Sequence, residues 1–248
     1  MGTRVERPPG NHAVQRALRL LDRVAQGPGP LTLSDLAREL GLPKSSAHSL
    51  LRALLGAGFL EGDARGGYRV GLHAFEIGAA YLRGMDPVTA ARPDLVRLRD
   101  ELGMTAHFAV LDGRDAVYLA KEDPAALGPS LASALGARLP AAATAVGKAQ
   151  LAHRPEGPLG DAESDFAGGR LDRELEEARR RGFAVDAGET KPGIGCVAAP
   201  VFDADGRCCG AIGVSYLVAG GPAAGALGPQ VVAAARRTSA RLGHGSGR

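Results

Sequence analysis

The chain has 248 residues, enough for one or two domains, and 45% of them are hydrophobic, so a sizeable core can be buried. Tryptophan is absent and aromatic residues make up only 4%, so the core must consist mainly of leucine, valine and alanine. No stretch approaches the roughly 20 apolar residues of a membrane-spanning helix. The first 12 residues lack the apolar run of a secretory signal, and we therefore expect a cytoplasmic protein.

Positive charge is concentrated at the N-terminal end. Residues 1–72 contain ten Lys and Arg against six Asp and Glu, whereas the remaining 176 residues contain 20 against 21. The formal net charge of +3 therefore arises in the first third of the chain. A basic segment of this kind suits a polyanionic partner such as a nucleic acid.

Two helical patterns open the chain. Residues 12–26 place apolar side chains at helical spacing, and "GPGP" at 27–30 ends that helix. Ser34 is a candidate N-cap for a second helix, which Gly41 ends in the left-handed conformation that suits glycine. The expected buried face of the first helix consists of Val14, Ala17, Leu18, Leu21 and Val24.

A third helix is expected from Pro43, a residue type favoured at the first helical position. Its polar side carries short hydrogen-bond donors and cations, and residues 43–60 contain no Asp or Glu. Such a face can enter a DNA major groove, and two helices joined by a short turn with glycine are typical of a helix-turn-helix. The expected buried side consists of Ala47, Leu50, Leu51 and Leu54, and the donor side of Lys44, Ser45, Ser46, His48, Ser49 and Arg52.

A β-hairpin, or wing, is expected next, because Phe59-Leu60 and residues 68–70 bracket the polar stretch "EGDARGG". Arg65 near its tip and Arg69 on its second arm complete the candidate DNA-binding residues. A three-helix packing unit with a solvated polar face is the alternative. Helix spacing, charge distribution and hairpin all agree with DNA binding, which we therefore prefer.

The rest of the chain mixes helices with hairpins, which indicates an α+β fold with a mostly antiparallel sheet. Hairpins are expected across "DGRD" at 112–115 and "DADG" at 203–206. Helices are expected over 73–84, 87–102 with Pro93 marking a bend or break, 143–153, 171–181 and 227–242. We expect residues 11–72 to form a winged helix-turn-helix DNA-binding domain, 73–86 a linker helix, and 87–243 an effector-binding domain.

An anion site is expected where the helix over 143–153 begins. Backbone N–H groups at Thr144, Ala145 and Val146 are free at that end, and the helix dipole favours a negative charge there. Lys148 is expected to be a surface or helix charge. Neither the six histidines nor the cysteines have metal-ligand spacing, so we expect no metal and no cofactor.

Several motifs in order resemble the IclR family of bacterial transcriptional regulators. They are "LTLSDLARELGLPKSSAHSLLRAL", "GGYRVGLHAFEIGAAYL", "HFAVLDGRDAVYLAKED", "GARLPAAATAVGKAQLA", "GETKPGIGCVAAPVFDADGR" and "AIGVS". The resemblance implies a two-domain repressor or activator. Its C-terminal domain would be a profilin- or GAF-like α/β module that binds a small organic acid. Homodimers or dimers of dimers would bind palindromic double-stranded operators.

The resemblance also implies a location for the acid. The backbone at Ala145 and Val146 would hold its carboxylate, with Asp186, Cys196 and Ser215 as pocket side chains. Gly213 lies where some family members have serine, Ala142 where many have histidine, and Ser49 where many have arginine. Gly213 and Ala142 lack polar groups and should open space, so we expect an acid bulkier or less polar than glyoxylate or pyruvate.

Asp186 and Cys196 each admit a second interpretation. Asp186 would repel a carboxylate, so it would accept a hydrogen bond from a ligand hydroxyl or from backbone, or simply cap a turn. Cys196 could be the nucleophile of a small-molecule hydrolase or isomerase with an accessory helical domain, if a partner such as His107 activated it. A free cysteine on a strand is more often a small buried hydrophobe, and three cysteines, two of them the adjacent Cys208 and Cys209, form no disulfide framework. A protein without ligand, acting only by interaction, is a third alternative.

Overall fold

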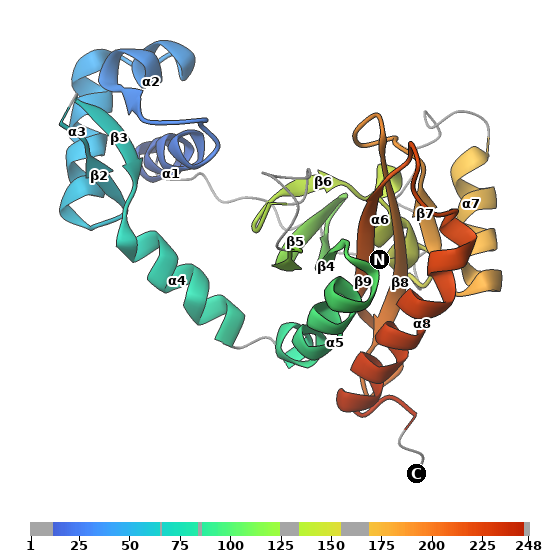
Figure 1. Cartoon of the computed structure of the whole chain (residues 1–248). Coiled ribbons are helices and arrows are strands. Elements are labelled where there is room, and N and C mark those ends of the chain that lie inside the picture. Colours follow the sequence, from blue (N-terminus) through green and yellow to red (C-terminus); the bar gives the residue numbers. More distant parts are fainter. Residues whose placement is uncertain (1–11, 65, 84–85, 125–133, 155–168, 246–248) are drawn as a thin grey trace. The chain divides into compact units, whose positions relative to one another are not determined.

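The computed structural model describes residues 12–64, 66–83, 86–124, 134–154 and 169–245, so the wing residue Arg65 lies outside the described residues. The chain folds into two compact units, Met1–Gly84 and Met85–Arg248 (Figure 1). None of the helices in the described ranges is long and apolar enough to cross a membrane.

The first unit is a helix-turn-helix followed by a hairpin. Its elements are α1 (His12–Ala25), β1 (Leu31–Thr32), α2 (Leu33–Glu39), α3 (Lys44–Gly56), β2 (Leu60–Gly62), β3 (Gly67–Val70) and α4 (Leu72–Arg83). The strands form a small antiparallel sheet in the order β1-β3-β2. The expected wing is therefore present, as the β2–β3 hairpin.

Leucines from several elements form the core of the first unit, and the expected face of α1 is partly wrong. Leu20 and Val24 are the buried residues of α1, whereas Val14 and Leu18 are 53% and 54% exposed. The apolar residues of this helix span a wider sector than its two buried positions, so their spacing alone does not say which part meets the core. The buried cluster consists of Leu20, Val24, Leu36, Leu51, Leu54 and Leu60.

The start of α2 and the turn after it are built by short polar and glycine residues. Thr32, not Ser34, is the N-cap: its hydroxyl accepts from the Asp35 N–H, and Asp35 accepts in return from the Thr32 N–H. This reciprocal pair satisfies two free donors and starts the helix earlier than expected. Gly41 has φ +63° as expected, and the Leu42 N–H closes the turn on the Ala37 carbonyl at 2.9 Å.

The second unit is a six-stranded antiparallel sheet in the order β6-β5-β4-β9-β8-β7. This confirms the α+β fold with an antiparallel sheet. Helix α5 continues through Pro93, so the expected break is absent. The elements are α5 (Asp86–Leu102), β4 (Thr105–Asp112), β5 (Asp115–Glu122), β6 (Arg138–Pro140), η1 (Ala141–Ala143), α6 (Ala145–Leu151), α7 (Arg170–Arg181), β7 (Ala184–Asp186), β8 (Ile194–Phe202), β9 (Cys208–Leu217) and α8 (Ala224–Arg241).

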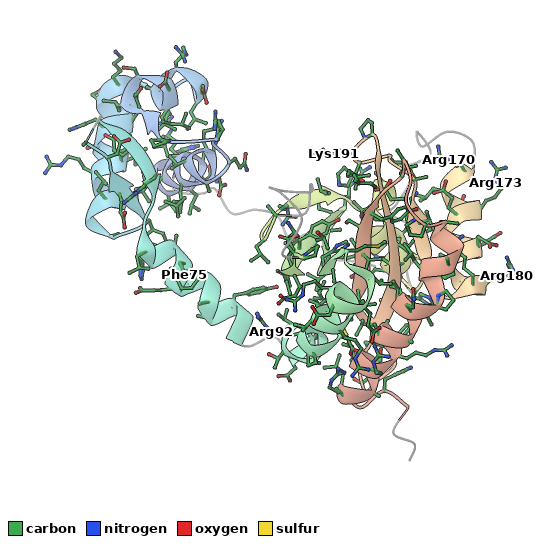
Figure 2. The ribbon with its side chains drawn as sticks, in the orientation of Figure 1. Phe75, Arg92, Arg170, Arg173, Arg180 and Lys191 are labelled. Carbon is green, nitrogen blue, oxygen red and sulfur yellow. The ribbon has the colours of Figure 1, made fainter. Side chains whose placement is uncertain are left out.

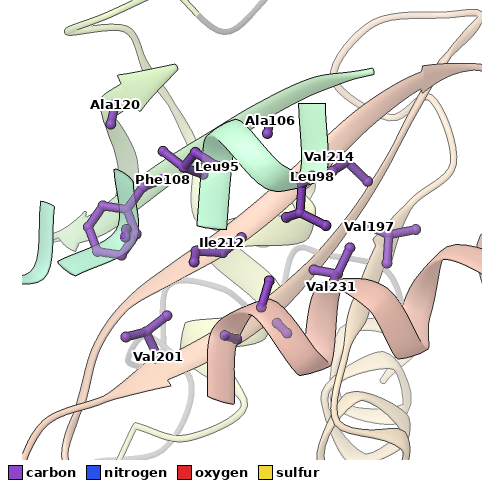
Figure 3. Packing of buried hydrophobic residues seen from close by; sticks show 14 of the residues in the cluster. Leu95, Leu98, Ala106, Phe108, Ala120, Val197, Val201, Ile212, Val214 and Val231 are labelled. Atoms are coloured by element: carbon purple, nitrogen blue, oxygen red, sulfur yellow. The ribbon is translucent and has the colours of Figure 1, made fainter. Parts of the chain in front are cut away.

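Helices cover both faces of this sheet (Figure 1). On one face α5 and α8 bury Leu95, Leu98 and Val231 against Phe108 and Ile212 of the strands (Figure 3). The other face packs against α6 and α7 and contains many alanines. Because side chains alternate along a strand, the second face also receives His107, Cys196, Gly213 and Ser215.

A buried carboxylate joins α5 to α8. Asp94 is 1% exposed, and its oxygens accept from Arg237 Nε at 2.6 Å, Thr238 Oγ1 at 3.0 Å and Arg241 Nη2 at 2.6 Å. Both arginines are partly exposed, so they remain hydrated while they neutralise the buried charge. This contact fixes the two helices that cover one face of the sheet.

Replacing this carboxylate by an amide should weaken the second unit. Asp94→Asn should lower the free energy of unfolding by about 1.5–3 kcal/mol, because charge-assisted hydrogen bonds are lost at a buried position. Urea denaturation followed by circular dichroism measures this. Asp100→Asn on the same helix is the control, since its exposed pair with Arg99 should contribute less than about 1 kcal/mol. Equal losses in the two variants would contradict the role given to Asp94.

Candidate nucleic-acid interface and ligand pocket

Helix α3 has one buried side and one exposed side. Ala47, Leu51 and Leu54 are buried in the core and Leu50 is half-buried, as expected. On the opposite side Lys44, Ser45, His48, Ser49 and Arg52 are exposed, and Ser46 is half-buried. The packing therefore leaves a continuous donor surface available to a partner.

This surface is positively charged, and no described residue neutralises its charges. Among the described residues, no hydrogen bond or ion pair involves the side chain of Lys44 or Arg52. No side chain caps the N-terminus of α3, where Pro43 is the N-cap residue. Its first backbone N–H groups, the helix dipole and Lys44 together favour an anion at this end.

The wing contributes a paired cation. Arg69 on β3 lies opposite Glu61 on β2, and its Nη2 is 2.9 Å from Glu61 Oε2. Asp63 shapes the described part of the hairpin by accepting from the Gly67 N–H at 2.7 Å. The exposed Arg69–Glu61 pair is easily rearranged, because surface ion pairs contribute only about 0–1 kcal/mol.

A small cavity lies on the second face of the six-stranded sheet. Its volume is about 20 Å³, and three of the expected pocket residues, Asp186, Cys196 and Ser215, line it. The Cys196 sulfur is 3.2 Å from Ser215 Oγ. A cavity of this size holds about one water molecule, so an organic acid must widen it. The other lining residues are Tyr118, Leu139, Thr190, Lys191 and Ile194.

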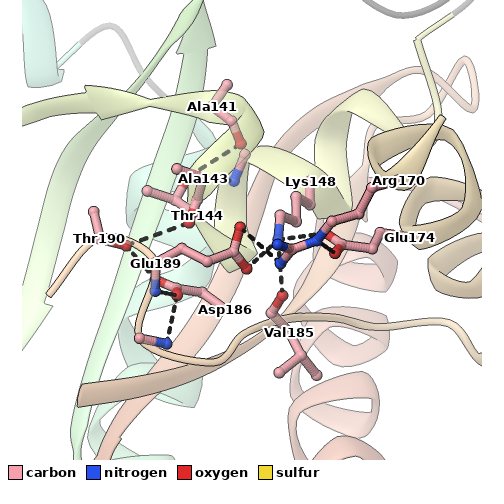
Figure 4. Close-up of polar contacts among 12 residues, drawn as sticks. Ala141, Ala143, Thr144, Lys148, Arg170, Glu174, Val185, Asp186, Glu189 and Thr190 are labelled. Atoms are coloured by element: carbon pink, nitrogen blue, oxygen red, sulfur yellow. Dashed lines mark hydrogen bonds and ion pairs between the residues drawn. The ribbon is translucent and has the colours of Figure 1, made fainter. Parts of the chain in front are cut away.

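The Asp186 carboxylate shapes the loop beside this cavity (Figure 4). It accepts from the N–H groups of Gly188 at 2.9 Å and Glu189 at 2.7 Å, and from the Thr190 hydroxyl. This geometry corresponds to the turn-capping interpretation of Asp186. Thr190 Oγ1 also lies 3.3 Å from the carbonyl oxygen of Ala143, so the loop contacts the segment that leads into α6.

Helix α6 begins at the expected anion site but is short and buried throughout. Thr144 is its N-cap, and the Thr144 hydroxyl accepts from the Gly147 N–H at 3.1 Å. Ala145 and Val146 are buried in the second core and do not line the cavity. A ligand in the cavity would reach their N–H groups only after the pocket had widened.

Lys148 is a helix charge on α6, as one of the two expectations had it, but it is not at the surface, because it is only 1% exposed. Its Nζ lies 2.6 Å from both Glu174 on α7 and Glu189 in the loop after β7 (Figure 4). Helix α6 packs between the sheet and α7, and a cation in such a place requires carboxylate partners. Burial raises the pKa of Glu174, but hydrogen bonds from Lys148 and Arg170 outweigh it and hold that pKa below its usual range.

Gly213 was expected to open space in the pocket, but it does not, because the His107 ring fills the space beside this glycine. A Cβ on Gly213 would lie 2.7 Å from His107 Nε2 and 3.0 Å from the carbonyl oxygen of Val197. His107 contacts Tyr118 edge to face, with ring centroids 5.2 Å apart. Ala142 likewise packs into the second core and does not line the cavity.

Cys196 lacks the surroundings of a nucleophile. Burial raises the pKa of its thiol to about 12, and its hydrogen-bond partner is Ser215, not histidine. A thiol in this state contains almost no thiolate near neutral pH. Within the described ranges, no cluster of histidine, cysteine and carboxylate side chains could hold a metal ion.

Comparison with known proteins gives one consistent family over nearly the whole chain. Residues 13–64 match the family described as IclR helix-turn-helix domain, and residues 79–240 match Bacterial transcriptional regulator IclR C-terminal. The chain is 34% identical over 217 residues to the HTH-type transcriptional regulator XynR of Escherichia coli K12, covering 83% of this chain and 86% of that protein.

Two further similarities extend over comparable lengths. The HTH-type transcriptional repressor AllR of Klebsiella pneumoniae is 32% identical over 218 residues, covering 83% of this chain and 80% of that protein. The crystal structure of Thermotoga maritima IclR superimposes with a TM-score of 0.74 at 28% identity, covering 94% of this chain and 99% of that one. Because both halves of the chain match in order, this protein belongs to the IclR family of bacterial transcriptional regulators.

Proposed function

We propose that α3 enters the major groove of an operator and that a small organic acid bound in the second unit changes the affinity for that operator. The observation that carries the proposal is the exposed, acid-free donor side of α3, opposite its buried leucines. A typical coupling of about 1–3 kcal/mol would change DNA affinity about 5–150-fold. The protein would act in the cytoplasm, where bacterial DNA lies, as a repressor or an activator.

The proposed DNA contacts come from α3 and the wing. The helix would supply direct contacts to bases and phosphates, and the wing would reach the backbone or the minor groove. Arg69 would exchange Glu61 for a phosphate. On this proposal residues 11–72 are the DNA-binding domain, 73–86 the linker helix and 87–243 the effector-binding domain. The contacts are Lys44, Ser45, Ser46, His48, Ser49, Arg52, Arg65 and Arg69.

We propose that the protein binds its operator as a homodimer or a dimer of dimers. Helix α4 carries exposed apolar side chains along its length, including Phe75, which is 70% exposed (Figure 2). Apolar residues gathered on one helix indicate a surface that another chain covers. Two copies would present two α3 helices, which suits a palindromic operator. The other exposed residues are Leu72, Ile77 and Tyr81.

The proposed effector site is the cavity beside the loop after β7. The polar groups that line it come from separate strands, and the loop contacts the segment before α6. An acid that widens the cavity would reach the N–H groups of Ala145 and Val146 with its carboxylate. The acid would also disturb the Lys148 ion pairs, which join α6, α7 and this loop. Asp186, Cys196, Gly213 and Ser215 complete the site.

Removing a cation from the exposed side of α3 should weaken operator binding. Arg52→Ala should reduce the affinity by about 1–3 kcal/mol if Arg52 contacts a base edge. The measurement is fluorescence anisotropy with a duplex enriched from a random library by the full-length protein. Arg180→Ala removes another exposed arginine, from α7, and is the control (Figure 2). Equal affinities of the two variants would remove Arg52 from the interface.

An organic acid that binds the cavity should stabilise the protein against heat. At 100 times its dissociation constant it should contribute about 2.7 kcal/mol, which a thermal-shift screen detects. Ser215→Ala should diminish this shift while operator affinity without acid stays unchanged. Ser45→Ala on α3 should instead weaken operator binding and leave the thermal shift unchanged. If Ser45→Ala rather than Ser215→Ala removed the shift, the effector would lie elsewhere.

We further propose that the protein performs no catalysis at Cys196, in keeping with relatives that are transcriptional regulators. Burial raises the pKa of Cys196 and Cys208 to about 12 and that of Cys209 to about 11. All three thiols should therefore react slowly with a disulfide reagent at pH 8, and faster as the pH rises toward 11. Protein unfolded in urea should react fully at pH 8. Fast reaction of native protein at pH 7, lost in Cys196→Ala, would support the hydrolase alternative instead.

A further inference from the structure

His107 on β4 is a buried polar side chain without a partner. It is 1% exposed, and neither ring nitrogen has a hydrogen bond to any described residue. Within the same part of the chain, its Nδ1 and Nε2 are the only fully buried side-chain nitrogen or oxygen atoms in this condition. Because buried polar groups are nearly always hydrogen-bonded, this exception requires an explanation.

His107 does not line the effector cavity but contacts a residue that does. It pairs with Gly213 on β9, and its ring lies over that glycine. The ring contacts Tyr118, which lines the cavity. The neighbouring Thr105 pairs with Ser215, which also lines the cavity. An acid must widen the cavity to enter, and a cavity widened past Tyr118 would reach His107.

The charged groups near His107 are paired with each other and not with the ring. Lys121 lies opposite His107 on β5, and its Nζ is 2.9 Å from Asp123 Oδ2. The Thr105 hydroxyl donates to Asp123 Oδ1 at 2.7 Å. Burial first, and then the charge of Lys121, lower the pKa of His107 to about 4, so the ring is neutral. A neutral imidazole offers one donor and one acceptor.

We infer that His107 is an effector-binding residue that hydrogen-bonds a hydroxyl group of the bound acid, so the effector is a hydroxy acid. This inference rests on the proposed function, in which the cavity admits a small organic acid. A hydroxyl group both donates and accepts, which matches the neutral ring. A second carboxylate only accepts, so it would suit only a ring N–H, whereas a hydroxyl suits either ring nitrogen. Lys121, which lies opposite His107, is already paired with Asp123 and would not neutralise a second carboxylate. Gly213 is required because a side chain there would displace the ring.

The test compares hydroxy acids with their matched unsubstituted acids. Isothermal titration calorimetry on the full-length protein uses glycolate and acetate, lactate and propionate, and 4-hydroxybenzoate and benzoate. We expect the wild type to bind the hydroxy member of at least one pair tenfold or more tightly than its counterpart. His107→Phe keeps a ring but removes both nitrogens, and should abolish this ratio while the unsubstituted acid still binds. His107→Asn, with a donor and an acceptor, should keep part of it.

A control and a stability readout separate ligand binding from a structural role. His153→Phe changes a half-buried histidine at the end of α6 and should leave the ratio unchanged. His107→Phe should also raise the melting temperature without ligand, because two unsatisfied buried groups are removed, whereas loss of a structural histidine would lower it. An unchanged ratio in His107→Phe, or no hydroxyl preference in the wild type, would overturn the assignment of His107 alone. Failure of every acid to bind the wild type would overturn the acid site itself.

Discussion

Burial of leucines on one side of α3 decides which side of the helix faces outward, and the proposed DNA-reading surface depends on that packing. Leu51 and Leu54 are enclosed by the core of the first unit. Burying each of these leucine side chains stabilises the folded unit by about 1.5–3 kcal/mol. A rotation of α3 that brought Ser49 inward would expose a leucine and bury a hydroxyl without a partner, so both changes oppose it. The left-handed turn at Gly41 holds α3 at its angle to α2. The same packing that stabilises the unit therefore presents its donors.

Side chains alternate between the two faces of the six-stranded sheet, so one face can serve stability and the other can carry the polar groups of a binding site. One face is apolar and is covered by α5 and α8, whose pairing the buried Asp94 secures. The other face carries His107, Cys196 and Ser215 beneath α6. Buried polar groups reduce stability unless they are satisfied, and their concentration on one face beside a cavity points to a ligand. The Lys148 ion pairs link that cavity's loop to α6 and α7. On the proposed function, an acid that widens the cavity would therefore act on all three.

The elements were largely predictable, whereas several positions of side chains were not. The donor face of α3 and the hairpins β4–β5 and β8–β9 follow from local spacing and turn residues, which a single sequence contains. The family resemblance predicted that Asp186 and Cys196 lie in one pocket, and both line the cavity. The prediction that Leu18 of α1 faces the core was wrong, because the apolar surface of this helix is wider than the part that contacts the core. The burial of Lys148 and His107 was not predicted, because it depends on α7 and on strand pairing, which join residues distant in sequence.

The central claim, that the donor side of α3 meets DNA, is tested most directly by hydrogen–deuterium exchange measured by mass spectrometry. Full-length protein would be compared alone and with a saturating duplex that it selects from a random library. Slower exchange is expected in peptides that contain the first turns of α3, residues 44–52, and in the wing, residues 60–70. Exchange in α8, residues 224–241, serves as the internal reference. Protection that left α3 unchanged and appeared on another surface would contradict the account.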